Sequence, residues 1–368
     1  MARKSRGEVV DPNEIQVFHV LNRTVRRCWL FGRDPVTGIN YDHRKAWIEE
    51  RLRHFAALFG IDLLAFAILS NHYHLMLRSR PDVVATWDDT EVARRWLMIC
   101  PHRKQKDGTP CEPTAKELDA IRNCGQKLAE IRLRLSDISW WMRLLDQRIA
   151  RRCNDEDQAT GRFFEDRFKA IPLIDDQAIT ACAVYIDLNL IRACIAETVE
   201  LSDHTSGQLR ARAWRAKLRV SASELDQTPS RASTNKTTPS VDSVDAFLSP
   251  VGVSEISDQP GPMGSPTGKR CSDKGFLQMS DQAYLELLDW TARQTAPGKA
   301  GPTGVEPPPI LVRLGLPPAV WLGMVAEFGR LFPTMAGLPH HVERVRSRKR
   351  GLRYHVRAAT RELFSQGA

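Results

Sequence analysis

The chain has 368 residues, 42% of them hydrophobic, and a formal net charge of +9. This composition fits a soluble globular protein with ample core, and the charge favours a polyanionic partner such as nucleic acid. The apolar run 63–77 is broken by Ser70, Asn71 and two histidines, so no membrane span is expected, and no apolar segment follows the basic N-terminus to form a secretory signal. These features predict a cytoplasmic protein. The eight cysteines contain no Cys-x-x-Cys pair, which argues against a zinc ribbon or a disulfide scaffold.

The first elements in chain order predict a sheet with a crossing helix. Residues 16–23 form an expected first strand, and Asp42 is the expected N-cap of a helix that runs to Phe59. Residues 61–69 and 71–80 predict two strands around Ser70, apolar on both faces near the start, as in the centre of a sheet. Residues 81–136 depart from this pattern. They predict an inserted helical region with a helix over 90–99, a polar loop over 101–113 and one helix over 114–135.

The second half begins with a helix capped by Ser136 or Asp137. A loop and strand over 161–174 follow, and Asp175 or Asp176 opens a helix that is expected to reach about residue 196. Residues 221–274, rich in Ser, Thr, Pro and Gly, predict a flexible linker. The linker leads to a C-terminal helical, basic unit over 279–368. We expect this unit to be separable, so that residues 1–220 keep the chemistry.

The segment Asn71–Met76 carries two histidines two positions apart. On a strand, His72 and His74 point to one face and Tyr73 points to the other. Paired imidazoles on a rigid strand suit a metal ion. A structural role is the alternative, because histidines on an apolar strand are often simply packed. In a basic chain, the pair favours phosphate chemistry at a metal site.

A second group of polar side chains lies on the helix that begins near Asp176. At 100° per residue, Tyr185, Asn189 and Arg192 fall on one flank of its apolar stripe. A phenol, an amide and a guanidinium in one row suit a nucleophile, an oxygen ligand and a phosphate clamp. Tyr73 is the rival nucleophile, although strand alternation points it away from the metal face.

Four segments together resemble a known family. They are residues 18–23 with Phe18-His19-Val20 and Arg23, residues 71–77, residues 161–169 and residues 185–193. In this order and spacing they resemble the HUH single-tyrosine insertion-sequence transposases, and among these most closely the REP-associated tyrosine transposases. The resemblance covers residues 13–205, with 81–136 as a longer insertion than in compact members. Any one segment alone is a weak signal, whereas four in order are specific.

The resemblance implies an α+β fold, a ferredoxin-like βαββαβ palm with an antiparallel sheet. It implies a divalent metal, Mg²⁺ or Mn²⁺, on His72 and His74, with Asn189 as a third ligand and Tyr185 as the nucleophile. The implied partner is single-stranded or hairpin DNA, as in repetitive palindromic sequences, and the protein is either a monomer or a homodimer. Leu190 and Cys194 stand where the family often has Pro and Gly, a departure that bears on how the helix ends.

Basic side chains extend the expected DNA contact. The candidates are Arg162, Arg167 and Lys169 near the third segment, Arg192 beside the tyrosine, and Arg348, Lys349 and Arg350 in the tail. Solvated surface is the alternative for the residues of the loop and of the tail. Neighbouring Phe163, Phe164 and Phe168 are expected to pack in the core rather than stack on bases. His19 is expected to pack within its strand, and the alternative is that it supports the metal-binding histidines from behind.

The predicted function is a transposase-like endonuclease and strand transferase that forms a 5′-phosphotyrosine intermediate. Two alternatives stay open. One is a catalytically quiet DNA-repeat-binding protein of the same fold. The other is a relaxase or replication-initiator nuclease, which shares the paired histidines but places its tyrosine differently.

Overall fold

The sheet that carries the predicted histidines has four antiparallel strands. The structure is a computed structural model that describes residues 11–225, 243–252, 261–295, 306–348 and 356–365. Its strands are β1 (Val17–Arg23), β2 (Ile61–Ile68), β3 (His72–Ser79) and β4 (Lys169–Leu173), in the spatial order β2-β3-β1-β4. The strands expected at 16–23, 61–69 and 71–80 are therefore confirmed, and the chain has an α+β architecture.

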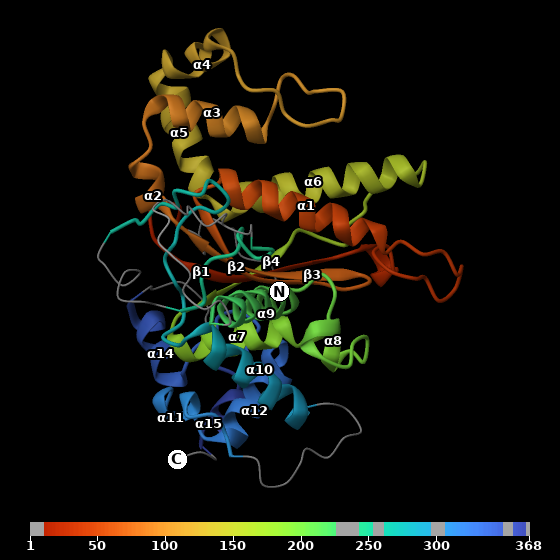
Figure 1. Cartoon of the computed structure of the whole chain (residues 1–368), viewed down its shortest axis with the longest axis vertical. Coiled ribbons are helices and arrows are strands. Elements are labelled where there is room, and N and C mark those ends of the chain that lie inside the picture. The colour runs from red at the N-terminus through yellow and green to blue at the C-terminus, as the bar shows by residue number, and fades with distance from the viewer. Residues whose placement is uncertain (1–10, 226–242, 253–260, 296–305, 349–355, 366–368) are drawn as a thin grey trace.

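Helices cover both faces of this sheet (Figure 1). On one face lie α1 (His43–Leu58) and α6 (Ile138–Glu156), and on the other lie α7 (Asp176–Asp187) and α9 (Ser206–Leu225). Side chains point alternately to the two faces along β1, β3 and β4, so successive residues of a strand enter different cores. The α1–α6 core takes its strand side chains from one set of alternate positions and the α7 core from the other. The first set includes Phe18, Val20, Leu75 and Leu77, and the second includes Met76, Ile171 and Leu173.

The insertion between β3 and α6 is helical, as expected. Its helices are α2 (Pro81–Ala85), α3 (Asp89–Ile99), α4 (Ala115–Arg122) and α5 (Gly125–Ser136). The single helix predicted over 114–135 is wrong, because the chain breaks between α4 and α5, where Cys124 is extended at φ −119° and ψ 93°. Asn123 and Gly125 flank this break, and both residue types have low helix propensity.

The helix expected to run to residue 196 also breaks. The side chain of Asp175 caps α7 by accepting a hydrogen bond from the backbone N–H of Ala178 at 2.9 Å, as predicted. The helix ends at Asp187, and Leu188 at φ −93° and ψ 5° separates it from the short α8 (Asn189–Arg192). Asp187 at this break accepts hydrogen bonds from the Ser206 hydroxyl and the Gly207 backbone N–H at the start of α9.

The segment 221–274, expected to be a flexible linker, contains described stretches that are packed. Helix α9 continues to Leu225, and the described stretches 243–252 and 261–274 pack against the sheet. Phe247 and Leu248 enter the α1–α6 core. Ser272 donates a hydrogen bond to the buried Asp62 carboxylate and contacts the Arg80 guanidinium. A few apolar residues and well-placed polar partners thus hold a segment whose composition indicated disorder. Residues 226–242 and 253–260 lie outside the described residues.

The C-terminal helices share the α7 core, which contradicts the expectation of a separable unit. They are α10 (Asp281–Thr295), α11 (Ile310–Arg313), α12 (Pro318–Ala326), α13 (Phe328–Leu331), α14 (Pro339–Arg348) and α15 (Ala358–Ser365). Tyr284, Trp321 and Val325 are buried in one cluster with α7 side chains, and Leu173 of β4 forms a parallel bridge with Ala336. In the part of the chain that the structure describes, no helix combines the length and the apolar character needed to cross a bilayer.

Candidate active site

Three histidines of the sheet lie on the face that α7 covers. In the register of β1 with β3, Leu21 is opposite His74 and Arg23 is opposite His72, so these side chains share a face with His19. His19 Nε2 and His74 Nδ1 are hydrogen-bonded at 2.8 Å. His72 Nδ1 is 2.6 Å from Asn71 Oδ1. The predicted pair is therefore a group of three, because His19 contacts His74 directly, as in the alternative considered for it rather than in the packing role that was favoured.

The protein environment keeps all three imidazoles neutral. Burial is the main cause in each case. It lowers the pKa of His19 to about 3 and that of His72 to about 4, and it holds the pKa of His74 well below its usual range. Nearby cations add to the effect, Lys169 at His19 and Arg23 at His72. A neutral imidazole keeps the lone pair that a metal ion needs.

Tyr185 of α7 packs on this group. Its ring centroid is 5.5 Å from that of His74 and 5.8 Å from that of His19, with the rings edge to face. The guanidinium carbon of Arg192 is 5.1 Å from the centre of the tyrosine ring. Burial raises the pKa of the phenol, while Arg192 and Asn189 act in the opposite direction. The phenol is therefore protonated at neutral pH and needs activation before it can attack.

Buried polar atoms between helix and sheet that have no hydrogen-bond partner among the described residues include His74 Nε2, Asn189 Nδ2 and His19 Nδ1. Buried polar groups are normally satisfied, so each such atom needs an explanation. His72 and His74 both use Nδ1 for a hydrogen bond to protein. This leaves Nε2 of each ring as the atom that can bind a metal ion, which is the usual arrangement for histidines that bind metals. No group of three or more His, Cys, Asp or Glu side chains in the described ranges is arranged to hold a metal ion.

The C-terminal helices form the third wall of the site. Phe328 of α13 stacks on Tyr185 with ring centroids 5.4 Å apart, and its centroid is 5.8 Å from that of His19. Arg192 donates a hydrogen bond to the carbonyl oxygen of Ala326. A methyl group at Gly329 would lie 3.7 Å from the tyrosine hydroxyl. Sequence reasoning missed this wall, because nothing in the pattern around residue 328 indicates a contact with residue 185.

Tyr73, the rival nucleophile, lies on the opposite face of β3. It is fully buried in the α1–α6 core, and its hydroxyl donates a hydrogen bond to Asp146 of α6. Burial raises the pKa of this phenol well above its usual value. The structure therefore holds Tyr73 away from the histidines, as strand alternation predicts.

The predicted DNA-binding residues have different surroundings. Arg162 and Arg167 are exposed on the loop before β4, and Lys169 lies opposite Leu21 in the register of β4 with β1, on the histidine face. Phe163 and Phe168 in the same segment are buried in the core. Arg348 is the last residue of α14, and nothing is described of its side chain, while Lys349 and Arg350 lie outside the described residues.

The loop after β1 adds basic residues that the sequence pattern did not single out. Arg26, Arg27 and Trp29 are exposed there, and both arginines have positive φ, 53° and 58°. Asn71 donates a hydrogen bond from Nδ2 to the carbonyl oxygen of Arg27 at 3.1 Å while it contacts His72 through Oδ1. One sequence signal could have indicated this basic loop. It is the dipeptide Arg26-Arg27 close to a tryptophan, directly after the strand that carries His19.

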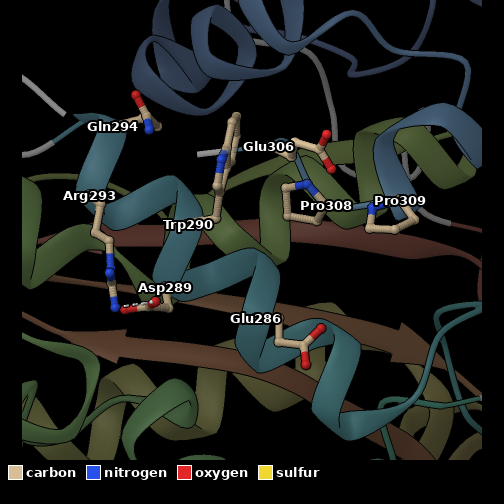
Figure 2. Close-up of a pocket in the computed structure, with 8 residues that line it drawn as sticks. All are labelled: Glu286, Asp289, Trp290, Arg293, Gln294, Glu306, Pro308 and Pro309. Atoms are coloured by element: carbon tan, nitrogen blue, oxygen red, sulfur yellow. Dashed lines mark ion pairs between the residues drawn. The ribbon is translucent and has the colours of Figure 1, made fainter. Parts of the chain in front are cut away.

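A groove beside α10 is the alternative location for a site. Figure 2 shows Trp290 and Glu286 of α10 lining it together with Glu306, Pro308 and Pro309. Asp289 and Arg293 in this groove form an ion pair at 2.8 Å, and none of the histidines or Tyr185 reaches it. The groove therefore offers no nucleophile paired with a base or a metal ligand, and the site at the sheet is the stronger candidate.

Comparison with known proteins does not establish a function for this chain, so a functional assignment depends on the side chains described above. No family model and no curated protein matches the chain. Among solved structures, a REP-associated tyrosine transposase bound to a REP hairpin matches with a TM-score of 0.32 and 10% sequence identity, over 65% of this chain and 96% of the other. A likeness at this level establishes neither a shared fold nor a shared function.

Proposed function

We propose that this chain is a metal-dependent nuclease and strand transferase that acts on single-stranded or hairpin DNA, with Tyr185 as the nucleophile. One observation carries the proposal: the Tyr185 ring packs on His74, 5.5 Å between centroids, where His74 Nε2 is buried without a partner among the described residues. The strand order β2-β3-β1-β4, with the α2–α5 insertion placed before α6, supports a ferredoxin-like βαββαβ palm as its scaffold.

His72, His74 and Asn189 are the residues that would hold the metal ion. The unpartnered Nε2 of His74 and the unpartnered amide of Asn189 fit this role, since the amide oxygen and nitrogen can exchange places by a flip. A bound divalent ion would supply charge stabilisation at a phosphate oxygen. Two imidazoles and an amide favour Mn²⁺ over Mg²⁺, which prefers an all-oxygen set that includes carboxylates.

Tyr185 and Arg192 supply the other groups that the reaction needs. Tyr185 Oη forms a bond to phosphorus and loses its proton, the bond from phosphorus to the 3′-oxygen breaks, and that oxygen takes up a proton. The products are a 5′-phosphotyrosine and a free 3′-hydroxyl, which reverses the reaction when it attacks in turn. The positive charge of Arg192 beside the ring favours the phenolate and attracts a phosphate.

DNA reaches the site most readily from the end of the sheet where His72 lies. Exposed Arg162, Arg167, Arg26 and Arg27 gather there, because Thr24 pairs with Phe164 and the Val25 backbone N–H donates to the Phe163 carbonyl. These arginines supply phosphate contacts, which fix the position of the strand without reading its sequence.

A second candidate function is DNA binding without turnover. The stacking of Phe328 on Tyr185 favours it, because this ring occupies one face of the nucleophile. In that case the histidine group would be structural, and the basic residues would account for all of the activity.

The experiment is a test for a covalent adduct. Wild-type protein, Tyr185→Phe and Tyr73→Phe are each incubated with labelled hairpin oligonucleotides that carry single-stranded flanks, with Mn²⁺, and run on a denaturing gel. We expect an adduct with wild type and Tyr73→Phe and none with Tyr185→Phe, which should still bind because only a hydroxyl is removed. An adduct that persists in Tyr185→Phe contradicts the nucleophile assignment, and binding without any wild-type adduct favours the second candidate.

A further inference from the structure

A cluster of arginines lies on the face of the molecule opposite the histidines. Arg51 belongs to α1, and Arg143, Arg148, Arg151 and Arg152 belong to α6, the two helices that cover the α1–α6 core (Figure 1). We call these five residues the α1–α6 arginine surface. Its acidic neighbours are few: Glu50 is 3.7 Å from Arg152, and Glu156 and Asp157 are engaged by Arg44.

Arg51 and Arg148 form the buried part of this surface. Arg148 donates from Nη2 to the carbonyl oxygen of Ile99 and contacts Cys100 Sγ at 3.8 Å, which ties α6 to the end of α3. Its Nη1 is buried and finds no partner among the described residues. Within the described ranges neither Arg51 nor Arg148 has a carboxylate at ion-pair distance, although both guanidiniums are largely shielded from solvent, which lowers their pKa.

Two neighbouring cations that are largely shielded from solvent carry a cost when nothing balances them. Arg51 is close enough to lower the pKa of Arg148 further, and both arginines, after burial itself, lower the pKa of the neighbouring His54. A charge taken out of water normally has a counter-ion or several hydrogen bonds. The unused Nη1 of Arg148 is therefore a donor that lacks its anion.

The outer part of the surface is exposed and pre-oriented. The guanidinium carbon of Arg152 is 3.9 Å from the centre of the Trp47 ring, and that of Arg143 is 4.7 Å from the centre of the Trp140 ring. Such stacking fixes the plane of a guanidinium and leaves its edge free to donate two parallel hydrogen bonds. Arg143 and Arg151 are eight residues apart on α6, which is about 12 Å along the helix axis. Several phosphates of one strand can be contacted at once.

We propose that the α1–α6 arginine surface binds the phosphodiester backbone of DNA, with one phosphate held between Arg51 and Arg148. Guanidiniums match phosphate oxygens in geometry and charge, and the indole rings that would stack on bases are used by Arg152 and Arg143. Binding is therefore independent of base sequence. The site lies across the sheet from Tyr185 and holds a stretch of DNA other than the one that is cleaved.

The test compares two double variants with a charge-matched control. Arg143→Gln/Arg151→Gln changes only exposed side chains, and Arg51→Gln/Arg148→Gln removes the buried pair. Arg212→Gln/Arg219→Gln on α9 changes the net charge equally, away from this surface. The affinity for a non-palindromic 30-nucleotide strand and for the corresponding duplex is measured by fluorescence anisotropy over a series of salt concentrations.

We expect each surface variant to bind both DNAs about three- to tenfold more weakly at low salt and to show a flatter salt dependence, by about 0.7–0.9 in slope for each phosphate that the variant no longer neutralises. The control variant should change little. Inorganic phosphate should raise the melting temperature of the wild type and not that of Arg51→Gln/Arg148→Gln. If that variant does not fold, Arg143→Gln/Arg151→Gln decides alone.

Two results would overturn the proposal. One is a salt slope in the exposed double variant equal to that of the α9 control. The other is binding of polyglutamate that depends on these arginines while DNA affinity is unchanged, which would assign the surface to an acidic protein. Adduct formation at saturating hairpin DNA reports separately on Tyr185, so a failure there leaves this test intact.

Discussion

The two faces of the sheet are built from alternate residues of the same strands, yet the strand side chains on the two faces differ in how completely their buried polar groups are satisfied. On the α1–α6 face, β3 contributes Tyr73, Leu75 and Leu77, and the one polar atom among these side chains, the Tyr73 hydroxyl, is bonded to Asp146. On the α7 face, β3 contributes His72, His74 and Met76, and buried nitrogens of His19, His74 and Asn189 have no partner among the described residues. A core formed for stability alone leaves few such atoms.

Among the strand side chains, the unsatisfied nitrogens lie on the α7 face, which supports the proposal that the chemistry takes place there. Unsatisfied buried groups cost stability and persist where another requirement holds them in place. The tyrosines on the two faces differ in the same way. Tyr73 is bonded through its hydroxyl within a packed core, whereas Tyr185 stacks between Phe328 and the histidines.

The largest difference between the two faces is expected when the C-terminal helices, which cover the α7 face, are deleted. Deleting residues 243–368 should leave residues 1–242 without a stable fold, because the α7 core loses Tyr284, Trp321 and Phe328 and the buried Asp187 loses its bond from the Tyr284 hydroxyl. Circular dichroism during thermal unfolding measures this, and Phe328→Leu, which keeps an apolar side chain, is the control. A cooperative unfolding transition in the truncated chain would restore the separable unit that the sequence predicts.

A smaller effect is expected when His74 on the α7 face is compared with His54 on the α1–α6 face. His74→Ala should lower the rate of cleavage about 10- to 100-fold or more and weaken the dependence on Mn²⁺, since it removes a proposed ligand and the partner of His19. His54→Ala on α1 is the matched control, because His54 bonds only to the carbonyl oxygen of Met98 at 3.2 Å among the described contacts. Equal losses in both variants would mean that the effect is structural.

The smallest effect is a dependence of stability on pH that arises on the packed face. Burial lowers the pKa of His54 to about 4, so between pH 6.5 and pH 4 the unfolded chain binds a proton that the folded chain does not. The stability contributed by the neutral imidazole is complete above pH 6.5 and is lost as pH falls towards 4. His54→Gln should therefore lose about 1–3 kcal/mol less than wild type over this range in denaturant titrations. Parallel curves would show that His54 does not titrate in this way.

Sequence reasoning located the strands and most helix starts because their signals are local. Alternation in β3 placed His72 and His74 on one face and Tyr73 on the other, and Asp175 and Asp137 cap their helices as predicted. Helix ends were harder to predict. The break at Leu188 coincides with contacts from Asp187 to α9, and local periodicity contains no information about such distant partners.

Two walls of the candidate site follow from residue spacing in the sequence, whereas the third wall does not. The row of Tyr185, Asn189 and Arg192 could be read from helical spacing, and the histidines from strand spacing. Phe328 lies far along the chain, beyond a segment that composition described as a linker. Phe247 and Leu248 pack in the α1–α6 core and hold the described stretch 243–252 against it, a contact that composition alone does not indicate.

The bond between Asp187 and Tyr284 also bears on how the protein is made. The Tyr284 hydroxyl lies 2.6 Å from the Asp187 carboxylate, and 97 residues separate the two in the chain. A ribosome adds about 5–20 residues per second, so about 5–20 s pass between the synthesis of these residues. Phe328 emerges later still. A nascent chain that already has its strands therefore carries Tyr185 on a helix that is not yet anchored, and we expect the candidate site to form only after Tyr284 and Phe328 have been synthesised.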